Sequence, residues 1–256
     1  MSYPLTSVLM NTIEQLRGLV DDPEVQGRYT NQYLVKHIVR PSIDKVVSSL
    51  ANSASCPVVC FYPITATGEI SRITLPPNVR SVLMIAERVN NINTSELVPR
   101  HIFHNQGRGW SIEGQDLVFD PPITIGNSSA SLNVVYEPSG SHSPIYDPAS
   151  GPANTEAFLD STDSKKFYLA KQPQLGVTDT RTNAYAGATL RIFKKDDGSI
   201  DITEEIWIDS SGYDSSNSRW YLTLKTAPVN YAAGTTKLHY EVGPPYSPDL
   251  VEAITM

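Results

Sequence analysis

The stretch LTSVLMNTIEQLRGLV, residues 5–20, and its neighbour VKHIVRPSIDKVVSSL, residues 35–50, carry the clearest helical pattern in the chain. Their apolar residues recur every three or four positions, which places them on one face of a helix. Pro23 and Gly27 separate the two stretches, so two short helices can fold back and pack their apolar faces together. The sequence therefore predicts an N-terminal helical hairpin.

The second of these helices has a predicted start and a predicted irregularity. Thr30 precedes the periodic run, and its hydroxyl can accept a hydrogen bond from an unpaired backbone N–H of the first turn. Pro41 removes one backbone hydrogen bond, at a cost of about 3 kcal/mol inside a helix. We therefore expect this helix to be kinked or split near Arg40. Charged residues off the apolar face are interpreted as solvated surface rather than as a subunit contact.

Composition limits the possible partners. The chain has 256 residues and a formal net charge of −7, and no run of Lys and Arg supplies the clustered positive charge that binding to phosphates needs. An acidic surface is still compatible with a channel through which DNA slides. No apolar run approaches the roughly 20 residues that span a bilayer, and residues 1–4 lack the basic start of a signal peptide. We expect a protein made in the cytoplasm that does not enter a membrane.

The rest of the sequence predicts strands and turns. Residues 53–137 form a first β-module, in which Val79–Val89 fits either a strand or a short helix. Residues 138–155 are rich in Pro, Gly, Ser and Asp and are expected to be a linker or an exposed loop. Residues 156–243 form a second module with regular alternation, as in an antiparallel sandwich or small barrel. Residues 244–256 form an extended arm.

These assignments give an α+β fold, in which a helical hairpin at residues 1–52 precedes mainly antiparallel β-modules. No nucleophile elbow, phosphate-binding loop or zinc-protease motif occurs in the sequence. The adjacent carboxylates Glu204 and Glu205 point apart on a strand and do not suit a glycosidase. We therefore predict no enzymatic activity, no cofactor and no metal site. The tryptophans are interpreted as core residues, with a sugar-stacking platform as the alternative.

Two groups of residues resemble proteins of known type. The segment Asp22-Pro23, followed by GRYTNQYL at residues 27–34, resembles the head-to-tail adaptor (connector) proteins of short-tailed phages. The segment YAGATLRI, residues 185–192, together with Ile206-Trp207-Ile208 and Leu222-Thr223-Leu224, looks like a β-module that recurs in phage virion proteins. Together with the connecting strands, these segments cover most of the chain.

The resemblance implies a structural protein of the virion neck, assembled in the host cytoplasm. Such adaptors form a twelve-fold ring, a dodecamer, between the portal protein and the tail proteins, and DNA passes through the ring during ejection without specific binding. Extended termini hold the neighbouring proteins. Here the expected partner-binding arm, pairing by strand addition, is carried by Leu250, Val251, Ile254 and Met256. The alternatives are another tail, nozzle or fibre-attachment virion protein and, ranked below these, a carbohydrate-binding module.

Overall fold

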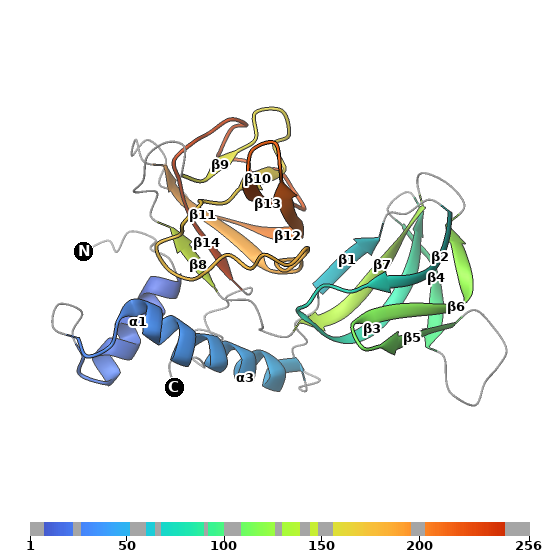
Figure 1. Cartoon of the computed structure of the whole chain (residues 1–256), viewed down its shortest axis with the longest axis horizontal. Helices are drawn as coiled ribbons and strands as arrows, with labels where there is room; N and C mark the ends of the chain where they lie inside the picture. Colours follow the sequence, from blue (N-terminus) through green and yellow to red (C-terminus); the bar gives the residue numbers. More distant parts are fainter. Residues whose placement is uncertain are drawn as a thin grey trace.

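The computed structural model describes residues 8–22, 27–51, 60–64, 68–89, 92–99, 109–125, 130–138, 144–147, 156–195 and 203–243. Helices at the N-terminal side are followed by two β-modules (Figure 1). The helical segments are α1, Val8–Leu19; α2, Asn31–Leu34; the π-helical turn η1, Val35–Val39; and α3, Arg40–Ala51. No helix in the described part of the chain is long and apolar enough to cross a membrane.

The predicted α+β fold with an N-terminal helical hairpin is wrong. The chain is mostly antiparallel sheet, with 48% strand and 18% helix, and its described residues form no such hairpin. The most extensive contact of α1 with the second helical stretch is at η1, and in Figure 1 α3 runs on toward the first β-module. The physical reason is that the helices bury their apolar faces partly against the second module.

That shared core joins the helices to the second module. Leu175 and Tyr146 of the second module pack with apolar residues of the helices, namely Leu9, Ile13, Leu34, Val35, Val39, Ile43 and Val47. The buried carboxylate of Glu241 accepts hydrogen bonds from the Leu9 backbone N–H, at 3.1 and 3.2 Å. Glu241 belongs to β14, and its carboxylate lies beside the first turn of α1, where negative charge stabilises a helix.

The second helical stretch confirms one predicted detail and changes another. The Thr30 hydroxyl caps α2 by accepting from the Tyr33 N–H at 3.2 Å. The kink or split expected near Arg40 takes the form of the π-helical turn η1, after which the helix continues through Pro41. The Arg40 N–H donates to the Val35 carbonyl, five residues back.

The first module is a seven-stranded sheet in the order β1-β7-β3-β4-β5-β6-β2. Val79–Val89 is a strand, paired antiparallel with β7. Its core contains Ile85, Leu117 and Val134. The strands are β1, Cys60–Ile64; β2, Gly68–Thr74; β3, Val79–Val89; β4, Ile92–Pro99; β5, Gly109–Glu113; β6, Asp116–Ile125; and β7, Ala130–Pro138.

The second module is also a seven-stranded sheet, in the order β8-β14-β11-β12-β13-β10-β9. The alternating residues that predicted its strands, such as Leu190, Ile192 and Leu222, are fully buried. The segment 138–155, expected as a linker, contains β8, whose Ile145 is fully buried. The strands are β8, Ile145–Asp147; β9, Phe158–Leu159; β10, Lys166–Tyr168; β11, Thr189–Lys195; β12, Glu204–Asp214; β13, Arg219–Leu224; and β14, Leu238–Gly243.

Candidate functional site

Described residues of the adaptor-like motif form a network of hydrogen bonds between α1 and the start of α2. Arg17 of α1 pairs with Asp22 at 3.1 Å and donates to the Asn31 side-chain oxygen at 2.8 Å and to the Tyr29 carbonyl at 2.6 Å. Backbone N–H groups of Arg28 and Tyr29 donate to the Asp22 carboxylate. The Arg28 N–H is the main cause that lowers the pKa of Asp22. Together, these hydrogen bonds from Arg17, Arg28 and Tyr29 position the start of α2.

Aromatic side chains on the outer side of this connection remain exposed. Tyr29 and Tyr33 stack with their ring centres 5.0 Å apart, and Tyr33 lies 4.5 Å from His37. The two tyrosines are 38% and 44% exposed, and Leu19 and Val20 at the end of α1 are 70% and 56% exposed. We call these five residues the helix-end surface. Its exposed rings are of the kind that protein interfaces favour.

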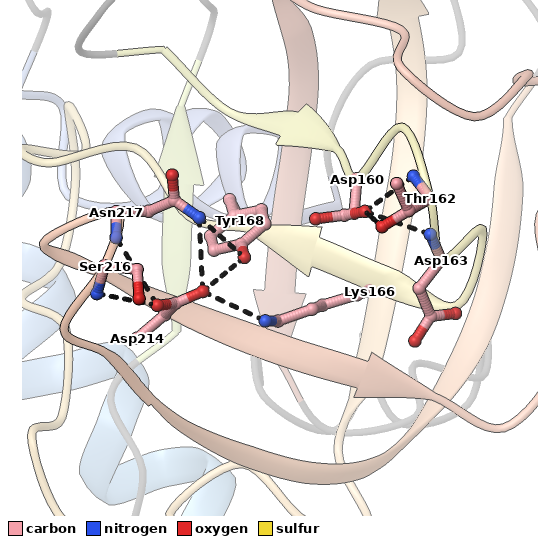
Figure 2. Close-up of polar contacts among 8 residues, drawn as sticks. All are labelled: Asp160, Thr162, Asp163, Lys166, Tyr168, Asp214, Ser216 and Asn217. Atoms are coloured by element: carbon pink, nitrogen blue, oxygen red, sulfur yellow. Dashed lines mark hydrogen bonds and ion pairs between the residues drawn. The ribbon is translucent and has the colours of Figure 1, made fainter.

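A polar cluster joins β10 to the end of β12 (Figure 2). The Asp214 carboxylate accepts from the Tyr168 hydroxyl at 2.5 Å and from the Lys166 ammonium at 3.0 Å. Asn217 donates to the same carboxylate through its side chain at 3.2 Å, and Ser216 donates through its backbone N–H at 2.9 Å. Lys166 also lies 4.3 Å above the ring centre of Tyr221.

Hydrogen bonds and burial shift the pKa values of the groups in this cluster. Hydrogen bonds from Tyr168 and Lys166 hold the pKa of Asp214 well below its usual range. The Tyr168 hydroxyl and the Asp214 carboxylate hold the pKa of Lys166 above its usual range, and burial raises the pKa of Tyr168. These shifts favour the charged forms of Asp214 and Lys166, so the ion pair ties β10 to the end of β12.

A cleft of about 470 Å³ opens beside this cluster in the second module. Tyr213 and Trp220, which face each other across β12 and β13, form its aromatic wall, with ring centres 5.3 Å apart and planes at 56°. Lys171 and Arg219 are its charged lining residues. The other lining residues are Leu169, Ala170, Gln172, Pro173, Gly176, Val177, Thr178, Thr180 and Ser218.

The cleft shows what sequence reasoning missed. The core prediction for the tryptophans holds for Trp110 and Trp220 but is wrong for Trp207, which is 40% exposed. Trp220 also lines the cleft next to Tyr213, which is 52% exposed. The two residues lie seven positions apart in the sequence, and only the antiparallel register brings them together. The alternation of aromatic residues in this hairpin is the available signal; a core position is its favoured interpretation, and an exposed stacking platform is the alternative.

The two adjacent glutamates of β12 engage different partners. Glu204 accepts a hydrogen bond from the Val229 backbone N–H at 2.6 Å, whereas Glu205 lies 3.6 Å from Arg191. Among the described residues, no group of three or more His, Cys, Asp and Glu side chains could hold a metal ion. The proposed arm residues Leu250, Val251, Ile254 and Met256 lie outside the described residues.

Comparison with known proteins identifies no relative: no protein-family model and no curated protein matches this chain.

Proposed function

We propose that the protein is a structural virion protein, a ring-forming adaptor that joins the portal to the tail of a phage and surrounds the DNA channel. The observation that carries the proposal is the helix-end surface, which presents stacked Tyr29 and Tyr33, with His37 beside them, next to the Arg17–Asp22 ion pair. Exposed aromatic residues suit a repeated contact between subunits, because they bury a large area at little entropic cost.

Two further features support this role. The adaptor-like residues Asp22, Thr30 and Asn31 all have structural tasks in the connection, as expected of a motif that sets a local geometry. The net charge of −7 disfavours tight binding to phosphates, which suits a channel that lets DNA pass. This role does not depend on a helical hairpin and uses the connection between α1 and α2 and the two β-modules.

The alternative is another tail, nozzle or fibre-attachment virion protein. It would use the same helix-end surface but differ in symmetry and in its neighbours. The number of copies in the assembly therefore separates the two.

The test is to image the protein by negative-stain electron microscopy, alone and mixed with a phage portal protein. Twelve copies seated on the portal support the adaptor, whereas six or three copies on tail proteins support the alternative. Tyr33→Asp should abolish assembly, because it places a charge in the subunit contact. Val229→Asp is the matched control, since Val229 is 88% exposed and lies outside the helix-end surface. Assembly unaffected by Tyr33→Asp would contradict the use of this surface.

A further inference from the structure

The cleft in the second module combines an aromatic wall with uncharged polar groups. Tyr213, which is 52% exposed, and the partly buried Trp220 present two rings tilted by 56° to each other. The cleft volume of about 470 Å³ lies within the range of about 300–1,000 Å³ that is typical of small-molecule sites. Such sites are mainly apolar and carry a few polar groups that orient a ligand. The cleft therefore has the size and the mixed lining of a binding site.

The uncharged polar side chains of the lining are available to a ligand. They belong to Gln172, Thr178, Thr180 and Ser218. Within the described part of the chain, no hydrogen bond or ion pair engages these four side chains. This distinguishes them from the neighbouring cluster around Asp214, in which the polar groups satisfy one another. The lining thus offers free donors and acceptors beside two aromatic rings.

Charge limits the class of ligand. Arg219 is already engaged, because its side chain donates to the Glu156 backbone carbonyl at 2.5 Å and lies over the ring of Phe158. Lys171 is exposed and is the other cation of the described lining, which contains no acidic side chain. Phosphate groups are held by clustered or bidentate cations. A single lysine instead suits a ligand that is neutral or carries one carboxylate.

Both walls of the cleft are fixed by contacts outside it. The lining segment 171–180 is anchored at Leu175, whose backbone N–H and carbonyl both pair with Tyr146, at 2.9 and 3.1 Å. On the opposite wall, Tyr213 directly precedes Asp214, whose carboxylate is held by the cluster drawn in Figure 2. A site that is already ordered loses less entropy when a ligand binds.

We propose that the cleft binds a saccharide, the class of ligand that combines an apolar ring face with many hydroxyl groups. The C–H groups on one face of a pyranose ring carry partial positive charge and pack on the negative face of an aromatic ring, here that of Tyr213. The sugar hydroxyls exchange hydrogen bonds with Gln172 and Thr180, and Lys171 pairs with a carboxylate where the sugar has one. This inference concerns the second module and does not rest on the virion role.

Sugar binding to the full chain tests the proposal. The probes are glucose, galactose, N-acetylglucosamine and glucuronic acid in saturation-transfer NMR, followed by an array of oligosaccharides that contain them. We expect at least one probe to bind, and Tyr213→Ala to raise its dissociation constant by about tenfold or more, as at an interface hot spot. Tyr213→Phe keeps the ring and should bind like the parent. Trp207→Ala is the matched control, since Trp207 is 40% exposed but does not line the cleft.

The polar half of the site has its own variants. Gln172→Ala and Thr180→Val remove polar groups and leave the aromatic wall intact. Each should raise the dissociation constant by about two- to tenfold, which is the effect of one uncharged hydrogen bond. Lys171→Gln should weaken the binding of glucuronic acid and leave that of the neutral sugars unchanged.

Two results would overturn the proposal: no sugar binding in either measurement, or sugar binding that is insensitive to Tyr213→Ala. A proline-rich peptide and a nucleotide are tested alongside. Binding of either one, weakened by Tyr213→Ala in the absence of sugar binding, would assign the cleft to that other class of ligand. Since none of these measurements involves the portal, failure here leaves the ring proposal to its own test.

Discussion

The Tyr136 hydroxyl, on β7 of the first module, donates a 2.8 Å hydrogen bond to the backbone carbonyl of Ala186 in the second module. The side-chain amide of Asn78 donates to the same oxygen at 2.6 Å, and both donors are buried. Nearby, Asn183 donates to the Tyr62 hydroxyl at 2.9 Å. These contacts join the two β-modules through a short turn that precedes β11, so the modules are held together by a few specific hydrogen bonds.

Tyr136→Phe should lower the free energy of unfolding by about 0.5–1.5 kcal/mol, because it removes one buried hydrogen bond and keeps the ring. Urea unfolding measures the change. Tyr213→Phe is the control and should stay within about 0.5 kcal/mol of the parent, because the Tyr213 side chain is half exposed. In a double-mutant cycle, Tyr136→Phe and Asn78→Ala should be non-additive, since they share one acceptor. Strict additivity would contradict a shared acceptor.

Thr30→Ala should destabilise the helical layer by about 1 kcal/mol, because the Tyr33 N–H loses the side chain that caps it. Thermal unfolding followed by circular dichroism measures the loss. Thr30→Ser keeps the hydroxyl and should retain most of the stability. Equal losses for both variants would show that the methyl group of Thr30, rather than its hydroxyl, stabilises this turn.

Gly176→Ala should destabilise the second module by more than about 2 kcal/mol. Gly176 has a φ of +81°, and an added Cβ would lie 2.1 Å from the Pro144 carbonyl oxygen. The matched variant is Gly18→Ala in α1, where a Cβ would meet no atom within 4 Å. Gly18→Ala should leave stability unchanged or raise it by up to about 1 kcal/mol, because alanine favours a helix over glycine. Chemical unfolding measures the stability of both variants. Unchanged stability of Gly176→Ala would contradict the close approach of Gly176 to the Pro144 carbonyl oxygen.

The melting temperature should fall as the pH drops below about 4. The pKa of Asp214 in the folded chain is lowered, chiefly by the Tyr168 hydroxyl, whereas an unfolded Asp titrates at about 3.9. The ionised carboxylate therefore stabilises the fold above the unfolded pKa, and this contribution is lost as the pH falls toward the lower folded pKa. Asp214→Asn should flatten the decline, which melting curves between pH 7 and pH 2.5 would reveal. An identical slope in both proteins would contradict this role for Asp214.

Local patterns predicted local structure well. The alternation at Leu190 and Ile192 gave buried strand positions, and Thr30 was recognised as a cap because its role depends only on the next few residues. The three-residue strand β8 could not be recognised, because its burial depends on pairing with β14. An apolar helical face likewise predicts that a helix is buried, but it does not predict which other element covers that face.

The error in the helical region and the missed cleft therefore share one cause. The partners of α1 include Leu175 and Glu241, which lie far away in the sequence. The wall of the cleft likewise depends on the register of β12 and β13. Neither relationship leaves a periodic signal in the sequence.

The π-helical turn determines which side of α3 faces the second module. The buried residues Val35, Val39, Ile43 and Val47 are spaced by four, and each such step overshoots a full α-helical turn by about 40°. The bond from Arg40 to Val35 closes a wider turn with an extra residue, which winds part of that rotation back. The buried residues therefore stay closer to one side of the helix than a four-residue spacing in a regular α-helix would allow. The number of residues between Val35 and Val39 also sets the angular position of every side chain that follows.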